Sequence, residues 1–356
     1  MGYKALTPED LVISTDSVTS TAWSNNNPQL STFFTSSIQV ATNTSQFYWS
    51  VYDLITTNSQ SALQFDVAYA DKVGSGSIWY NSLVPGISPS RTSYGQYRTL
   101  ILGDENADFI FGNFTSSFFY AIPVERACYK QTLMPGTMTL MISGSTGPAG
   151  ADNNTLRLTD DSLVTDSVTF TDAGRVFNIV SGSAGTVNTD VNANGWAGGA
   201  SQAYGSYGWF LPDISMILLN GDALNAGVGA DGGLNMGILR TSNTNVENPK
   251  LLIHALGRAG KFAGRGFTLN SEEALSSDFV FVRAQNSEFN YSSNPSFISG
   301  STGEVIFNSF IQNPQTYITT VGLYNDSQEL LAVAKLSRPL PKDFTKEMLV
   351  RVKLDF

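Results

Sequence analysis

The segment 314–356 carries the pattern that most restricts what this chain can fold into. Two apolar runs rich in β-branched and aromatic residues, 317–324 and 330–334, flank the polar turn 325–328, an arrangement typical of a β-hairpin. The residues that follow alternate, with Met348, Val350, Val352, Leu354 and Phe356 on one side and Arg351, Lys353 and Asp355 on the other. Such alternation predicts a half-buried strand, so we expect this segment to be built into a sheet up to Phe356.

Segments upstream have the same β composition. The predicted strands are 47–54, 62–69, 118–124 and 138–142, together with a strand pair across 97–119 that turns near 104–107. Within 62–69 apolar and polar residues alternate, which predicts that the face carrying Gln64 and Asp66 is solvated or lies in an interface. Thr7 and Pro8 predict the start of one short helix, since they suit its cap and its first position.

These patterns together predict the fold class and the domain organisation. We expect a mainly β protein built from antiparallel sandwich- or barrel-like domains, with long Gly/Asn/Ser-rich loops and few short helices. The expected domains are an N-terminal β domain with an arm (1–144), a loop-rich β region or insertion (145–250) and a C-terminal β domain (251–356). The arm is the loop-rich segment 72–95, and the C-terminal domain begins with the apolar run 251–257.

Several stretches of the chain resemble virion structural proteins of contractile-tailed bacteriophages. Residues 317–326 with 329–335 are similar to a segment found in the T4-like and cyanophage-type members, and residues 94–103 and 171–182 also resemble the cyanophage-type proteins. The resemblance implies a tail- or baseplate-associated virion protein that is assembled in the host cytoplasm and contacts other virion proteins without catalysis. A place at the neck or on the head surface remains open as an alternative.

The composition agrees with a protein that is built into an assembly. Only 14% of the residues are charged, against roughly 25% in ordinary soluble domains, while the chain has 22 Phe, 14 Tyr and 5 Trp. Interface cores are depleted in charge and enriched in aromatic residues, so we expect a homo-oligomer or contacts with other virion proteins. A large all-β core with neutral loops is the alternative. The expected core or contact anchors are Trp209, Phe210, Tyr317, Tyr324 and Phe356.

Charge and cysteine content narrow the range of partners and compartments. The net charge of −10 argues against nucleic-acid binding, which requires clustered Lys and Arg. The single cysteine, Cys128, excludes an internal disulfide framework and fits a reducing cytoplasm, where we expect a buried core thiol. No apolar run approaches the roughly 18 residues of a membrane span, so we expect neither a membrane span nor export.

The residues offer little for catalysis, cofactors or metals. His254, the only histidine, lies in an apolar run without a Gly-Xaa-Ser-Xaa-Gly elbow, and one Cys with one His cannot form a zinc site. Residues 190–195 match half of a calcium loop, but Ser201 stands where the bidentate Glu belongs. The acid pairs at 160–161 and 272–273 would suit a glycosidase, although a solvated turn or a helix start is the simpler interpretation. We therefore predict no enzyme, no cofactor and no metal.

The segment 257–266 superficially suggests phosphate binding. It lacks the glycine and the Ser or Thr that a Walker loop requires. Its basic residues Arg258, Lys261 and Arg265 form a possible electrostatic contact for an acidic neighbour, and a plain flexible connector is the alternative.

Two further functions are kept as hypotheses. One is a host-surface adhesin in which the Gly-aromatic strip 204–210 stacks against sugars, although a strand packed against a neighbour explains the same pattern. The other is a glycan depolymerase that uses Asp160 and Asp161. Both depend on where the structure puts these side chains.

Overall fold

The computed structural model describes residues 3–30, 33–36, 48–55, 60–74, 89–144, 155–188, 205–227, 232–240, 248–261, 266–292 and 294–355. Strands make up 49% of the structure and helices 14%, and a large antiparallel sheet forms a half-barrel. The predicted mainly β class is therefore confirmed.

The chain divides into two compact units. The central unit consists of Val18–Glu273, and the terminal unit combines Met1–Ser17 with Ala274–Phe356. The chain passes between them twice, within strand β1 (Leu11–Thr21) and within strand β18 (Asn270–Ala284). This division differs from the expected boundaries at 144 and 250, because strands from both sides of those positions join a single sheet.

The central sheet is antiparallel in every described pairing. Along the main path, the strands are β2 (Gln29–Leu30), β17 (Phe267–Thr268), β10 (Thr139–Ser143), β11 (Thr155–Asp160), β13 (Gly174–Ser183), β15 (Gly208–Leu211), β16 (Met216–Asn220), β8 (Phe118–Pro123), β5 (Gln60–Asp71), β4 (Tyr48–Ile55) and β3 (Phe34–Ser36). The short strands β12 (Thr169–Thr171) and β14 (Thr186–Val187) pair with β13. Strands β4, β5, β8 and β10 confirm the expected strands at 47–54, 62–69, 118–124 and 138–142.

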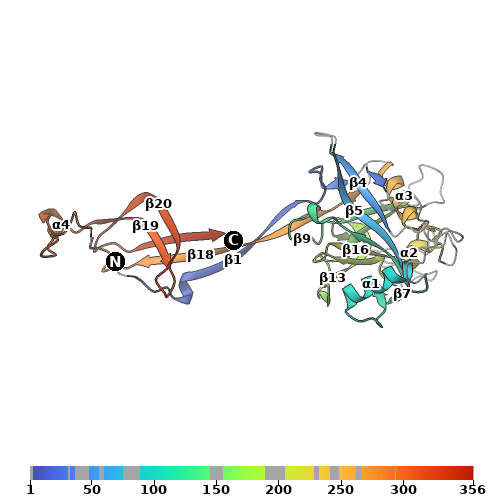
Figure 1. Ribbon diagram of the computed structural model, residues 1–356, viewed down its shortest axis with the longest axis horizontal. Helices are drawn as coiled ribbons and strands as arrows, with labels where there is room; N and C mark the ends of the chain where they lie inside the picture. The colour runs from blue at the N-terminus through green and yellow to red at the C-terminus, as the bar shows by residue number, and fades with distance from the viewer. Residues whose placement is uncertain are drawn as a thin grey trace. The chain divides into compact units, whose positions relative to one another are not determined.

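Both faces of the sheet are covered (Figure 1). Helix α3 (Asn248–Lys261), helix α2 (Gly221–Asn225) and the segment 232–240 contribute to the core on one face. Helix α1 (Ser90–Leu102) and the hairpin β6 (Phe109–Phe111)–β7 (Phe114–Ser116) lie on the other. Within β8, Tyr120 points into the first core and Phe119 into the second, so this strand reads as a continuous apolar run.

Two sequence-based expectations are wrong in this unit. Gln64 is fully buried, so the face of β5 that we expected to be solvated or in an interface is enclosed at that position. The segment 90–102 is helix α1, where we expected loop up to residue 95 and then a strand. Tyr94 and Ile101 share its buried face, and the helix ends at Gly103, whose φ of 66° is left-handed. The aromatic and β-branched residues of this helix outweighed its 3.6-residue periodicity in the sequence-based prediction.

The terminal unit confirms the hairpin and the final strand. Strands β19 (Thr316–Tyr324) and β20 (Leu330–Lys342) pair antiparallel, and β21 (Met348–Asp355) pairs with β18, which also pairs with β1. The segment 337–341, expected as an extended connector, is part of β20. The helix start at Thr7 is a single 3-10 turn, Pro8–Asp10, closed by a capping box between Thr7 and Asp10.

The core of the terminal unit is small. It consists of the buried valines Val280, Val350 and Val352, against which partly buried side chains of the β19–β20 hairpin and of β18 and β21 pack. Strand β9 (Thr132–Leu133) pairs with the part of β18 that belongs to the central unit. The remaining elements are the 3-10 turn Arg126–Cys128 in the central unit and helix α4 (Asn308–Gln312) in the terminal unit.

Candidate interaction surface

The candidate catalytic and metal-binding residues are not brought together in the described part of the chain. His254 is exposed on α3, and the described residues contain no group of three or more His, Cys, Asp or Glu that could hold a metal ion. Glu272 lies in β18 opposite Thr132, and the half calcium loop 190–195 lies outside the described residues. Among the helices that the structure describes, none combines the length and the apolar character needed to cross a bilayer.

In the acid pair Asp160–Asp161, the first residue is buried and the second is half-buried, where we expected solvated side chains. Asp160 is fully buried, and its Oδ2 accepts hydrogen bonds from the Gly136 N–H at 2.6 Å and from the Ser162 hydroxyl. Asp161 accepts from the backbone N–H of Asn178 at 2.9 Å and from its amide nitrogen at 3.2 Å, and burial raises the pKa of the Asp161 carboxyl. Each carboxylate holds a different segment in place, which is a structural arrangement and gives the depolymerase hypothesis no paired site.

Cys128 is buried, as expected of a core thiol. Its Sγ lies 3.5 Å from the Leu63 carbonyl oxygen and 3.9 Å from the Ser24 hydroxyl. Desolvation by burial raises the pKa of the thiol, so little of the nucleophilic thiolate is present at neutral pH.

We therefore expect native Cys128 to react with a chromogenic disulfide reagent at least roughly tenfold more slowly than the same thiol in denatured protein at pH 8. Because the chain has one cysteine, the absorbance reports this site alone. The native rate should rise with pH, since the thiolate fraction rises. Equal rates in native and denatured protein would show that the thiol is accessible.

Among the ion pairs of the described residues, the one between Asp71 and Arg240 has the most buried carboxylate. The Arg240 guanidinium donates to both carboxylate oxygens of Asp71, at 2.9 Å from Nε and 2.8 Å from Nη2, and Nη2 also donates to the Ser117 hydroxyl at 2.8 Å. The same guanidinium lies 4.3 Å from the centre of the Phe118 ring, and the Tyr69 hydroxyl donates to Asp71 at 3.1 Å. These contacts tie the segment 232–240 to the end of the central sheet, so we assign them to stability.

Two of the five predicted anchors are core residues of the central unit. Phe210 is fully buried in β15. Trp209, on the opposite face of the strand, packs edge-to-face against Phe109 at 5.7 Å and Phe111 at 5.3 Å between ring centres. Phe210 is therefore a core residue, and Trp209 is partly buried beside the second core.

The Gly-aromatic strip does not form an exposed sugar-stacking surface in its described part. Tyr207 is buried and donates from its hydroxyl to the Gly232 carbonyl at 2.8 Å, and Trp209 is packed as above. Tyr204 lies outside the described residues. The alternation of glycines and rings reflects close packing in the sheet, because a Cβ on Gly208 would lie 1.8 Å from the Leu218 carbonyl oxygen.

The anchors in the terminal unit have a different environment. Tyr317 is 60% exposed and Tyr324 is 44% exposed, so both are available for contact and neither is a core residue. Phe356 lies outside the described residues. Arg258 and Lys261 belong to α3, but their side chains are outside the described part, as is all of Arg265, so the proposed electrostatic contact stays a prediction.

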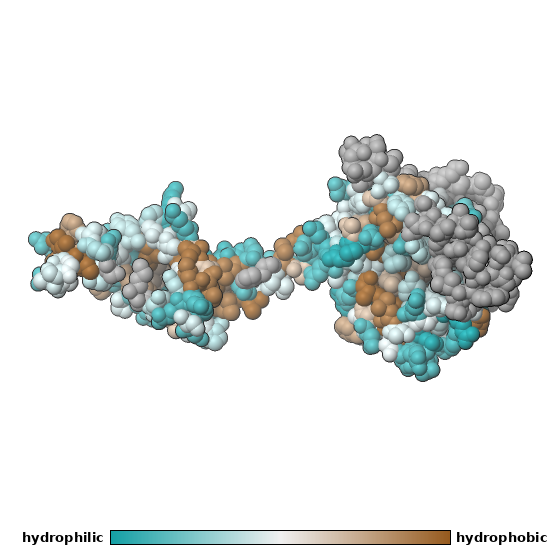
Figure 2. Space-filling model, viewed as in Figure 1, coloured by the Kyte–Doolittle hydropathy of each residue, from teal (hydrophilic) through white to brown (hydrophobic). Residues whose placement is uncertain are grey.

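The outer face of the β19–β20 hairpin carries an apolar patch. The Tyr3 and Tyr324 rings meet edge-to-face at 5.1 Å, and the Tyr324 ring lies over Gly322, where a Cβ would approach its edge to 2.9 Å. Leu331, at 68% exposed, is the most open apolar side chain of this face. We call this surface the hairpin patch, and it consists of Tyr3, Tyr324, Leu330, Leu331 and Val333. Figure 2 shows apolar residues gathered on the surface over the strands of this unit.

Strand β1 is a second apolar surface, and sequence reasoning missed it. Leu11, Val12 and Ile13 are consecutive and all exposed, and Asp16 is the only charged residue in the strand. The signal was present in the sequence as an apolar triplet before a Ser/Thr-rich stretch. It was overlooked because short apolar triplets are usually buried when a strand joins a sheet.

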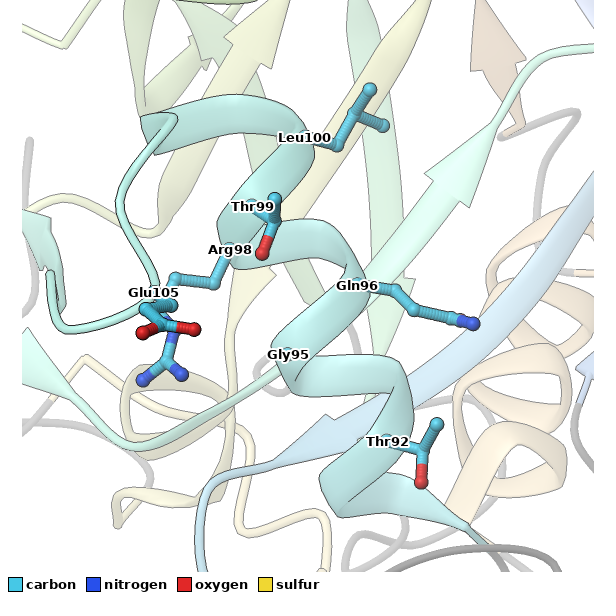
Figure 3. A pocket seen from close by; sticks show the side chains of 7 residues that line it. All are labelled: Thr92, Gly95, Gln96, Arg98, Thr99, Leu100 and Glu105. Carbon is cyan, nitrogen blue, oxygen red and sulfur yellow. The ribbon is translucent and has the colours of Figure 1, made fainter.

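The described surface also has open depressions, two of which are considered for ligand binding. One, of about 660 Å³, runs along the outer face of α1, where Arg98 extends toward the loop that carries Glu105 (Figure 3); its lining is Thr92, Gly95, Gln96, Arg98, Thr99, Leu100 and Glu105. The other, of about 600 Å³, lies in the terminal unit and is lined by Phe297, Phe307, Ser309, Phe310, Gln312, Asn313 and Gln315. The first has no set of converging catalytic groups. The second combines uncharged amides with the exposed ring of Phe307 and the partly buried rings of Phe297 and Phe310.

The terminal unit therefore presents the strongest candidate for interaction: the hairpin patch, the β1 surface and the aromatic depression all belong to it. In the central unit, by contrast, two clusters of buried aliphatic and aromatic side chains lie on the two faces of the sheet, and Phe34 and Phe170 are the exposed rings among its described residues. No protein-family model matches this chain, and neither a curated protein nor a solved structure matches it.

Proposed function

We propose that this protein is a non-enzymatic structural component of a tailed-phage virion, in the baseplate region of the tail, that acts through contacts between subunits. The observation that carries the proposal is the terminal unit, which has a small buried core and much exposed apolar surface. Contiguous exposed apolar surface on a soluble chain marks a site of protein association.

A neighbouring subunit would stabilise the terminal unit by covering its exposed apolar side chains. In the isolated chain, water contacts the side chains of Leu11, Val12, Ile13, Leu331 and Val333. Each Å² of apolar area that a neighbouring subunit covers contributes about 25 cal/mol to the free energy of association, and the cost of ordering the two partners is subtracted from that sum. Repeated around a symmetric particle, many modest contacts of this kind hold the assembly firmly.

The sequence supports the virion assignment at the same place. The segment that most resembles contractile-tailed phage proteins, 317–335, forms β19, its turn and the first part of β20. We propose that the hairpin binds neighbouring subunits and that the central unit serves as a rigid body. A location at the neck or on the head surface would use the same surfaces.

The first test is whether the protein is present in the particle. Virions of the phage that encodes the chain are purified by density-gradient centrifugation and their proteins quantified by mass spectrometry. We expect the chain at a fixed, symmetric copy number per particle, comparable with that of the tail proteins. Recovery only in the soluble fraction of the lysate, and not in particles, would contradict the proposal.

A glycan-binding adhesin is the second candidate, and one observation favours it. The Phe297 ring contacts the Phe307 ring at 5.4 Å and the Phe310 ring at 5.5 Å between centres, and the amides of Gln312, Asn313 and Gln315 line the same depression. Aromatic faces and uncharged amides together suit a neutral sugar.

A glycan array with purified protein tests the adhesin. Binding that Phe307→Ala abolishes and Phe344→Ala preserves would support the second candidate, because both rings are exposed and only Phe307 lines the depression. If the protein binds no glycan on the array, the adhesin hypothesis is rejected and the structural role in the virion is retained.

A further inference from the structure

The terminal unit contains a sheet with two open edges. In the described part of the chain, β1 and β21 lie on either side of β18, and each pairs in this sheet with β18 alone. An open edge exposes a row of backbone N–H and C=O groups that can accept another strand. The two edges differ in side-chain character, and that difference points to the partner.

Strand β1 lacks most of the features that protect an edge. It runs for 11 residues without lysine or proline, and Asp16 is its single charge. Natural edge strands are usually short or carry proline, lysine or a bulge, because a long apolar edge recruits other chains. Ile13 is 66% exposed in this strand. We therefore expect another strand to pair with this edge.

Strand β21 has the complementary character. Arg351 and Lys353 are exposed on one side of it, while Val350 and Val352 face the core. The Arg351 and Lys353 cations lie 5.3 and 5.9 Å from the centre of the Phe279 ring, so they are held over the sheet surface near the edge. Lys353 also lies 2.8 Å from Asp355 in the same strand, so this edge keeps one excess positive charge, whereas β1 carries only the Asp16 carboxylate.

The charges disfavour pairing of identical edges. Antiparallel pairing of β21 with its own copy about Val352 would place Arg351 opposite Lys353, and like charges directly opposite each other destabilise a sheet. Pairing of β1 with itself about its centre would bring two Asp16 carboxylates together. Pairing of β1 with β21 of another copy instead places Asp16 where Arg351 or Lys353 can approach it.

We propose that a second copy of this chain covers the β1 edge with its own β21 edge, so that the three-stranded sheets of successive copies join into one continuous sheet. The inference rests on the proposed function and specifies how the copies in the particle meet. Because the two edges are different surfaces, the contact is heterologous: repeated, it closes into a ring or continues as a filament.

The first arm of the test measures association of the full chain by analytical ultracentrifugation over a range of concentrations. Ile13→Lys is expected to weaken self-association roughly tenfold or more, because it puts a charge on the covered edge. The matched control is Val73→Lys, at a side chain that is 67% exposed in the central unit, and it should leave association unchanged. Both sites are exposed, so thermal unfolding should confirm that both variants fold.

Charge reversal tests the pairing itself. Asp16→Lys and Arg351→Glu should each weaken association, and the double variant should recover most of the loss, since it restores opposite charges across the contact. Additive weakening in the double variant would overturn the proposal.

Disulfide trapping distinguishes the two kinds of edge contact. Mild oxidation of a mixture of Val12→Cys and Leu349→Cys proteins should give the mixed dimer in roughly fivefold excess over either homodimer. Wild-type protein gives the background, because its sole cysteine is buried. Homodimers of the Val12→Cys protein in excess, or a wild-type protein that is monomeric at all concentrations, would overturn the inference. A chain that is present in virions and yet monomeric would leave the proposed function standing, whereas an oligomer absent from every virion would remove that function alone.

Discussion

Replacing Arg240 with alanine is expected to lower the free energy of unfolding of the central unit by about 3–5 kcal/mol. The change leaves the Asp71 carboxylate fully buried with only the Tyr69 hydroxyl and the Val73 N–H as hydrogen-bond donors. A buried charge that loses its partner keeps its desolvation cost and loses the attraction that offset it. Urea-induced unfolding followed by tryptophan fluorescence measures the difference.

The matched control is Lys72→Ala, which breaks a neighbouring ion pair. Lys72 and Asp108 lie 2.5 Å apart but are both substantially exposed, so we expect a loss of only about 0–1 kcal/mol. If Arg240→Ala and Lys72→Ala cost the same small amount, the buried pair does not hold the segment 232–240 in place, and our account of the central unit would need revision.

Replacing Lys342 with alanine is expected to destabilise the terminal unit by roughly 3 kcal/mol or more. Lys342 is fully buried, and its Nζ donates to the Asn286 carbonyl at 2.9 Å, the Asn290 side-chain oxygen at 2.8 Å and the Asp343 carbonyl at 2.9 Å. Alanine removes all three hydrogen bonds and takes this donor away from the side-chain oxygen of the buried Asn290, whereas the Asn286 carbonyl keeps the Asn290 amide as a donor. Since this unit has a small apolar core, the loss should open it while the central unit stays folded.

Hydrogen exchange read by mass spectrometry resolves the two units separately. We expect Lys342→Ala to increase exchange in β18–β21 without changing the central sheet, and Lys342→Met to behave similarly, because it replaces much of the volume but none of the hydrogen bonds. Lys335→Ala, at an exposed position of the same strand, should leave exchange unaltered. Protection that is equal in all three variants would show that the buried ammonium group does not hold this unit together.

Local patterns predicted the parts of the fold that depend on local chemistry. The β19–β20 hairpin follows from two β-rich runs about a polar turn, and β21 follows from strict alternation. Both signals are complete within one short window, so no tertiary information is needed to interpret them. The fold class followed in the same way, since β composition recurs along the chain.

Features that depend on contacts between segments far apart in the chain could not be predicted from the sequence. The enclosure of Gln64 and Asp160 requires the opposite faces of the sheet to be covered by segments far away in the chain. Helix α1 was missed because Tyr97, Thr99 and Ile101 favour a strand locally, whereas its buried side is specified by the core beneath it. Tertiary packing overrode local propensity in each case.

The candidate surface was predictable in part. Tyr317 and Tyr324 were identified from the hairpin, and they are exposed as contact residues should be. For Trp209 and Phe210 the sequence left open whether each is a core or a contact residue, because aromatic content does not reveal which side of a strand is covered, and the structure packs both against the central cores. The sequence carried the apolar triplet of β1, but that this strand is a sheet edge follows only from the strand order.

The most direct test of the central claim is a cryo-electron microscopy reconstruction of the intact virion at side-chain resolution. Our account predicts density for this chain in the tail, with Ile13, Leu331 and Val333 covered by neighbouring subunits. A particle without the chain, or one in which these three side chains face solvent, would contradict it.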